Sequence, residues 1–305
     1  MGAPELELKL SRYNRVYAPG ETVAGQALIT SNGGMSHNGI NIKVEGSVQL
    51  QLSANAVGVF EAFSSNIKPI VLLTLNKEVQ PAGKLGDGAI AIPFEFVLDP
   101  AKLCPSPRGL LDTYHGMYIT VQYTLTVEVV RSGMFSGGNL SESTEFIVDV
   151  PTKQGVNMMQ AASFLLTSET TKKSRGTKDP SQRFTIKGQL NSTNCLVQKP
   201  LSGYLVVHDS SVPIKSICLQ LIRVETICAV SEGTCKEASE VQSIMIAQGN
   251  VMPDVEIPIH VVMPRLFSAP SVNWPGFQLD FEANIVVEFE NGFTPVENIP
   301  LKIFR

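Results

Sequence analysis

Cysteine and histidine are the residues of this sequence best suited to nucleophilic, acid–base or metal chemistry. The chain of 305 residues has five cysteines and four histidines. A catalytic nucleophile needs a base within hydrogen-bond reach and a third group that orients the base. Cys195 and His208 are candidates, but no glycine elbow, helix start or carboxylate accompanies them in a recognisable order. We therefore predict a core thiol, a surface imidazole and no catalytic residues.

Metal and cofactor sites are not predicted either. The four histidines share no spacing that would place two of them on one metal ion. Cys228 and Cys235 have no Cys-x-x-Cys or His-x-x-x-His motif near them, and a structural zinc site needs such ligands. His115, beside Gly116 before a long apolar pattern, is expected to be a satisfied histidine at a domain contact, with a pH sensor as the alternative.

Two glycine-rich stretches and one basic stretch are candidates for binding loops. "GDG" (86–88) and "SGG" (136–138) are expected to be hairpin loops, because no Lys-Ser/Thr pair opening a helix follows either. The stretch 171–183 is expected to be a solvated polar loop that makes at most weak direct contact with a membrane. Its basic residues are Lys172, Lys173, Arg175 and Lys178.

Charge and hydropathy narrow the class of protein further. A formal net charge of −4 gives no basic surface for nucleic acid, so no nucleic-acid partner is expected. "MGAPELELKL" lacks the charged and apolar regions of a signal peptide, and Leu6 stands where myristoylation requires Ser or Thr. The five scattered cysteines suit a reducing compartment. We expect a soluble, cytoplasmic protein.

The apolar residues alternate with a period of two, which is typical of β-strands with one buried face. The clearest examples are 40–52, 91–98 and 117–130. Pro19-Gly20 predicts a type II turn between two strands, since Gly supplies the positive φ at the third position. Helical periodicity is weak, with one short turn at most in 53–63. The sequence predicts an all-β protein.

Segments of the first half recur in the same order in the second half. The recurrence predicts two tandem antiparallel β-sandwiches, an N-terminal one over 1–150 and a C-terminal one over 151–305. A hinge is expected at 151–160, and the first strand of the second copy at 163–170. The matched segments are 16–25 with 195–207, 40–50 with 214–225, 92–100 with 257–264, and 119–130 with 279–290.

Tandem sandwiches whose strands are separated by Pro-Gly turns of this kind resemble the arrestin fold. Within it, the sequence closely resembles the Down syndrome critical region protein 3 family, over nearly the whole chain from residue 16 onward. The stretches least like the family, "FSGGNL" and "VNMMQ" through "KDPSQR", are expected to be loops. The motifs that carry the resemblance are "VYAPGETVAG", "LQLSANAVGVFEAF", "IPFEFVL", "TYHGMYITVQYTL", "GQLNSTNC", "LQLIRVET" and "NIPLKIFR".

This resemblance implies a non-enzymatic subunit of the retriever complex, the counterpart of the arrestin-like sorting subunit of retromer. Such a subunit recycles membrane cargo from endosomes to the cell surface and lies peripherally on endosomes. The implied direct partners are an α-solenoid scaffold and a small metallophosphoesterase-like subunit. Sorting nexin 17 and a COMMD-containing assembly are implied as indirect partners, and no cofactor is implied.

One strand-like stretch departs from alternation. In "SEVQSIMIAQGN" (239–250), residues 244–246 are apolar in succession before an expected Gly249-Asn250 turn. Neighbouring strand residues point to opposite faces, so an apolar side chain must face outward unless its own sandwich covers it. Because the scaffold docks on the second sandwich in this fold class, the resemblance implies four scaffold-binding residues: Met245, Ile246, Ala247 and Gln248.

Two other classes of function are alternatives to this one. A stand-alone adaptor of the α-arrestin kind, recruiting other proteins to receptors, would carry PPxY motifs in a C-terminal tail. This sequence ends at "LKIFR" and contains no PPxY. An enzyme built on a β-sandwich is disfavoured because no catalytic motif was found.

Overall fold

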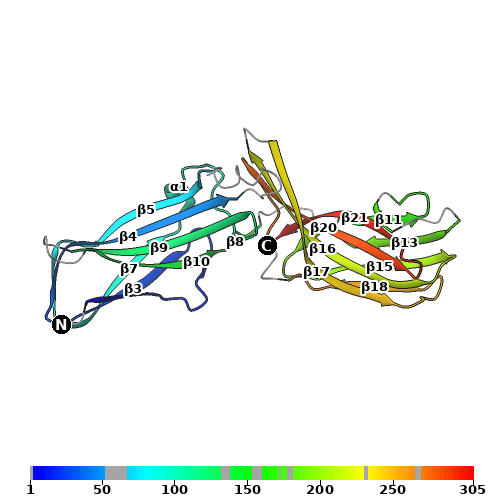
Figure 1. Cartoon of the computed structure of the whole chain (residues 1–305). Coiled ribbons are helices and arrows are strands. Elements are labelled where there is room, and N and C mark those ends of the chain that lie inside the picture. Colours follow the sequence, from blue (N-terminus) through cyan, green and yellow to red (C-terminus); the bar gives the residue numbers. More distant parts are fainter. Residues whose placement is uncertain are drawn as a thin grey trace. The chain divides into compact units, whose positions relative to one another are not determined.

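The computed structural model is almost entirely β-structure (Figure 1). It describes residues 3–51, 67–131, 138–152, 160–171, 173–176, 181–229, 233–264 and 269–305. These residues form two compact units, the first ending at Pro151 and the second running from Thr152 to Arg305. The only helix in the described part is α1 (Pro100–Leu103), which the Asp99 side chain caps by accepting a hydrogen bond from the Ala101 amide. The predicted all-β, arrestin-like fold of two tandem sandwiches is confirmed.

The first unit contains a three-stranded sheet and a seven-stranded sheet. The small sheet has, in spatial order, β1 (Glu5–Leu10), β3 (Thr22–Ser31) and β7 (Gly88–Val97). The large sheet has the order β2 (Val16–Tyr17), β10 (Leu140–Val148), β9 (Ile119–Arg131), β4 (Met35–Leu50) and β5 (Ile70–Gln80), with β6 (Gly83–Leu85) beside β4 and β8 (Tyr114–His115) beside β9. All pairs are antiparallel except β2 with β10.

The second unit contains a four-stranded and a seven-stranded sheet. The small sheet has the order β11 (Ala162–Thr167), β13 (Phe184–Leu190), β15 (Leu201–Ser210) and β18 (Glu256–Val261). The large sheet has the order β12 (Lys173–Arg175), β21 (Thr294–Phe304), β20 (Phe277–Phe289), β16 (Ile214–Ala229) and β17 (Gly233–Gln248), with β14 (Asn194–Leu196) beside β21 and β19 (Val272–Trp274) beside β20.

The strand order of the first unit recurs in the second. The order β2-β10-β9-β4-β5 of the first large sheet returns as β14-β21-β20-β16-β17, and β14 pairs in parallel with β21 as β2 does with β10. The small sheets correspond as β1-β3-β7 and β13-β15-β18, so β11 is an added edge strand rather than the counterpart of β1. The segments matched in the sequence therefore occupy equivalent strands in the two units.

Alternation places the core side chains as predicted. In β9, every second residue from Ile119 to Val129 is at most 3% exposed. Tyr123, in the middle of this strand, lies opposite Gly46 on β4, and its hydroxyl donates to the Leu111 carbonyl at 2.8 Å. Phe146 on β10 packs against the Tyr123 ring, with the two ring centroids 5.8 Å apart.

The Pro19-Gly20 turn forms, but it links two sheets rather than two paired strands. The Glu21 amide donates to the Ala18 carbonyl at 3.1 Å and Gly20 has φ of 87°. β2 before the turn belongs to the large sheet, and β3 after it to the small one. The turn is therefore a crossover within the sandwich.

Two loop predictions were wrong. "GDG" (86–88) is not a hairpin loop, because β6 before it pairs with β4 whereas β7, which begins at Gly88, pairs with β3. The basic stretch is not wholly a loop, because residues 173–175 form β12 on the edge of β21. The backbone of residues 173–175 pairs with β21. A strand of three residues is too short to be recognised from alternation of apolar and polar side chains.

Other predictions reach beyond the described residues. The short turn in 53–63, most of "SGG" (136–138), most of the hinge at 151–160, and Lys172 and Lys178 lie outside them. The strand expected over 163–170 ends at Thr167.

Candidate docking site

The cysteine and histidine considered as a catalytic pair are not brought together. Cys195 lies on β14 in the large sheet of the second unit, whereas His208 lies on β15 in the small sheet. Burial raises the pKa of the Cys195 thiol to about 11, and the Sγ atom donates to the Ser192 carbonyl at 3.7 Å. His208 Nδ1 is 2.6 Å from the Asp254 carboxylate. The thiol is a protonated core group, and the imidazole interacts with the Asp254 carboxylate.

Cys228, Cys235 and His115, considered as metal ligands or as a pH sensor, either point away from each other or already have a hydrogen-bonding partner. Cys228 lies opposite Thr234 and Cys235 opposite Ile227 in one antiparallel pair of strands, so the two cysteine side chains point to opposite faces. His115 Nε2 is 2.8 Å from the Glu145 carboxylate at an exposed position. Within the described ranges, no three His, Cys, Asp or Glu side chains are grouped to hold a metal ion.

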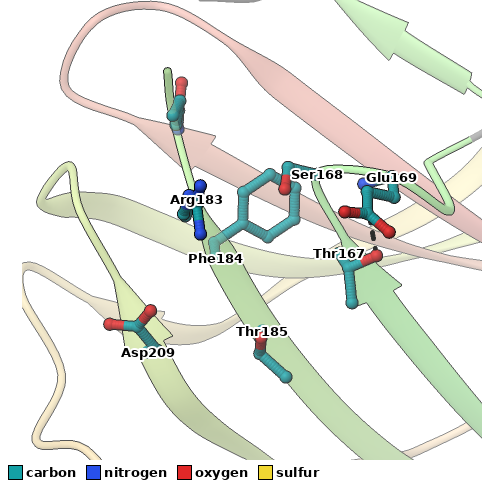
Figure 2. Close-up of a pocket in the computed structure, with 8 residues that line it drawn as sticks. Thr167, Ser168, Glu169, Arg183, Phe184, Thr185 and Asp209 are labelled. Carbon is teal, nitrogen blue, oxygen red and sulfur yellow. Dashed lines mark hydrogen bonds between the residues drawn. The ribbon is translucent and has the colours of Figure 1, made fainter. Parts of the chain in front are cut away.

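An open hollow of about 730 Å³ lies at one end of the small sheet of the second unit (Figure 2). Thr167, Thr185 and Asp209 stand in a row on β11, β13 and β15 along its wall. The Phe184 ring belongs to the core, with its centroid 5.1 Å from that of Phe289. The lining residues include no cysteine or histidine, and the Thr167 hydroxyl accepts a hydrogen bond from the Glu169 amide. The hollow is lined mainly by polar hydroxyl and carboxylate side chains, and it holds neither member of the cysteine–histidine pair considered from the sequence.

The stretch predicted to bind a scaffold forms the second half of β17. Among the described strands β17 pairs only with β16, so its other side is an edge of the large sheet. An edge strand presents unpaired backbone groups and often accepts a partner. None of its residues from Thr234 to Gln248 is fully buried.

A β-bulge explains why the apolar residues follow one another here. Met245 lies opposite Cys218 and Ala247 opposite Ile217, so Ile246 is one residue more than β16 can pair. A bulge shifts the alternation by one residue. Ile244, opposite the buried Leu219, faces the core side, and Met245 therefore faces outward.

The four predicted site residues differ in exposure. Met245 is 55% exposed, and Gln248 is exposed as well. Ile246 and Ala247 are half-buried. The apolar residue presented to solvent is therefore Met245, whereas Ile246 contributes partly to its own sandwich.

The segment after β17 is fixed by hydrogen bonds on both sides. Gly249 adopts φ of 80°, and its amide donates to the Lys215 carbonyl at 2.8 Å. Asp254 donates its amide to the Val207 carbonyl and pairs with His208. Between these anchors the loop exposes Met252 by 75%, and Val255 just after it by 48%. The strand end and the loop thus present apolar side chains from an ordered backbone.

The fold defines an arrestin-like protein of two sandwiches, and comparison with known proteins gives its family. Residues 7–292 match the family model for vacuolar protein sorting-associated protein 26 (Vps26). The chain is 39% identical over 307 residues to vacuolar protein sorting-associated protein 26C of Dictyostelium discoideum, covering 98% of this chain and 99% of that protein. The chain belongs to the Vps26 family, as the arrestin-like sorting resemblance predicted.

No helix in the described part of the chain is long and apolar enough to cross a membrane. The bulge at Ile246 and the ordered loop that exposes Met252 were missed by sequence reasoning. The run of apolar residues at 244–246 was the only signal of the bulge, and it does not distinguish a bulge from an exposed apolar face.

Proposed function

We propose that this chain is a non-enzymatic subunit of the retriever complex that docks on an α-solenoid scaffold. Membership of the Vps26 family supports a role in protein sorting. The retriever assignment rests on the resemblance of the sequence motifs to the Down syndrome critical region protein 3 family. The assembly recycles membrane cargo from endosomes to the cell surface. Cys195 and His208, the pair most like a catalytic one, lie in different sheets, which fits a role in binding.

The observation that carries the docking proposal is the outward position of Met245 on the edge strand β17. Its side chain is 55% exposed, although a methionine gains about 1.5–3 kcal/mol when it is fully buried. Methionine adapts its shape to irregular surfaces and is favoured at interfaces. Gln248 and the half-buried Ile246 and Ala247 border it. These four residues form the proposed scaffold contact.

The other proposed partners reach the chain through the assembled complex. These are a small metallophosphoesterase-like subunit, with sorting nexin 17 and a COMMD-containing assembly as indirect partners. A net charge of −4 disfavours direct adsorption on an anionic membrane. We therefore place the protein in the cytoplasm, peripherally on endosomes, held there by the complex.

The test compares two aspartate substitutions on the same face of β17. Met245→Asp would place a charge in a desolvated contact, whereas Ser243→Asp would place the same charge two residues away, opposite Gln220. We expect Met245→Asp to weaken binding to the purified retriever scaffold by roughly 100-fold or more, a loss of about 3 kcal/mol. Ser243→Asp should bind within a factor of about three of wild type.

Melting temperatures separate docking from folding. Met245→Asp should melt within about 2 °C of wild type because its side chain lies outside the core. Ile246→Asp should lower the melting temperature, since Ile246 is half-buried. Equal binding by wild type and Met245→Asp would refute the docking site. A wild-type chain that binds receptors directly and ignores the scaffold would favour a stand-alone adaptor instead.

A further inference from the structure

The outer face of the large sheet in the second unit carries an apolar row that crosses four strands. Met245 on β17 lies opposite Cys218 on β16, and Cys218 lies opposite Val286 on β20. Val286 in turn lies opposite Val296 on β21. Directly opposite residues of antiparallel strands project to the same face. We call these four residues the apolar row.

The apolar row faces away from the core of its own sandwich. Its neighbours along β16 and β20, such as Leu219, Ile285 and Val287, are at most 1% exposed and fill the core. Alternation then directs Cys218 and Val286 to the opposite face. Met245 is exposed, and the other three members are partly exposed.

Polar residues border the apolar row on both sides. On one side lies a row of Ser243, Gln220, Asn284 and Asn298. In that row the Asn298 amide donates to the Asn284 side-chain oxygen at 2.7 Å. On the other side the Ser216 hydroxyl donates to Glu288, which also pairs with Lys215 at 2.7 Å. An apolar centre between polar rims is the usual composition of a protein–protein contact.

The first unit shows that the fold does not require an apolar row at this place. The corresponding row there crosses β5, β4, β9 and β10 and is wholly polar. Its members are Asn76, Lys43, Thr126 and Ser143. The same sheet order thus forms with either kind of row, and the apolar side chains of the second unit need another explanation.

We propose that the apolar row is the seat of one amphipathic helix of the α-solenoid scaffold, lying across the strands. Neighbouring strands are about 4.8 Å apart, so the row is about 14 Å long. Apolar residues spaced three or four apart on a helix are about 5–6 Å apart, so about three successive turns match the row. Met245 joins the row to the contact proposed above, on which this inference rests.

The test copies the polar row of the first unit onto the second and leaves Met245 in place. The triple variant Cys218→Lys/Val286→Thr/Val296→Ser carries residues that the same fold already accepts in the first unit. We expect its affinity for the purified retriever scaffold to fall at least about tenfold, with a melting temperature within a few degrees of wild type. The reciprocal variant Lys43→Cys/Thr126→Val/Ser143→Val should bind the scaffold as wild type does.

Thiol labelling gives a second readout that needs no substitution. Cys218 in the apolar row should react with N-ethylmaleimide in the free protein and be protected in the scaffold complex. Cys228, exposed on the same strand, serves as the reference and should stay reactive in both. Equal labelling of Cys218 with and without the scaffold would overturn the proposal.

The outcomes separate this inference from the function on which it rests. Scaffold binding that is lost in Met245→Asp but unchanged in the triple variant would refute the helix seat and leave the docking site standing. Scaffold binding insensitive to both variants would refute both. Self-association of wild type that the triple variant abolishes, without any change in scaffold binding, would assign the row to a second copy of this chain and contradict the proposal.

Discussion

At Cys195, burial controls the chemistry of the thiol. The side chain is 6% exposed, and its pKa is raised from 9.0 to about 11. The thiolate is the reactive form of cysteine, and a raised pKa makes it scarce near neutral pH. A thiol in this state supports packing rather than catalysis.

We predict that Cys195 is the slower of two cysteines to be alkylated by iodoacetamide at pH 8. Cys228 is exposed and serves as the matched control. Mass spectrometry of the labelled peptides should show Cys228 modified first and Cys195 modified only when the protein is unfolded. Modification of Cys195 as fast as Cys228 in the folded protein would show that the thiol is accessible and ionised.

The raised pKa of Cys195 also predicts a loss of stability at alkaline pH. Below pH 9 the thiol is protonated in both the folded and the unfolded chain, so its contribution is fully present. Between pH 9 and about 11 only the unfolded chain ionises, which favours unfolding by up to about 2–3 kcal/mol. The difference in unfolding free energy between wild type and Cys195→Ala should shrink over this range. A difference independent of pH would contradict the assigned cause.

At the scale of single elements, strands β4 and β9 fit together because Gly46 has no side chain. A Cβ atom at Gly46 would lie 2.6 Å from two ring carbons of Tyr123 and 3.1 Å from the Cβ of Leu73. The ring occupies that space, and its hydroxyl accepts from the Leu111 amide as well as donating to the Leu111 carbonyl.

We predict that Gly46→Ala destabilises the protein by about 1–3 kcal/mol, because the ring must move and strain its two hydrogen bonds. Gly86→Ala is the control, since the nearest atom to its added Cβ would be 3.9 Å away. Thermal unfolding should show a melting temperature several degrees lower for Gly46→Ala only. Equal melting of both variants would show that the ring has room to shift.

The sequence predicted some elements well because their signal lies within one strand. Alternation in 117–130 identified the buried face of β9, and the recurrence of that segment at 279–290 predicted β20. The bulge at Ile246 was not predictable, because it depends on the register between β17 and β16. The crossover at "GDG" was missed as well, because a loop sequence does not indicate which sheet the following strand joins. The row that includes Val286 likewise appears only when four strands are aligned.

At the scale of the whole molecule, the large sheets of the two units share one strand order but differ in the side chains on their outer faces. The row in the first unit is polar and its counterpart in the second is apolar. The shared strand order accounts for the repetition in the sequence, and the difference between the two outer faces is the basis of the binding surface that we propose. The fold is held by two apolar cores, with no grouped metal ligands in its described residues.

We predict that a chelator leaves the melting temperature unchanged within about 1 °C, since a structural metal would couple its binding to folding. Differential scanning fluorimetry with and without 1,10-phenanthroline tests this directly, and a zinc-finger protein provides the positive control. A drop of many degrees for this chain would reveal ligands that the described residues do not include.

We propose that this chain is a sorting subunit that binds a scaffold. Isothermal titration of the wild-type chain into the purified retriever scaffold measures that binding. We expect one-to-one binding with a Kd of about 1 μM or lower, about 8 kcal/mol, which Met245→Asp weakens by roughly 100-fold or more and Ser243→Asp preserves. Absence of heat and of co-elution between the wild-type chain and the scaffold would contradict the claim.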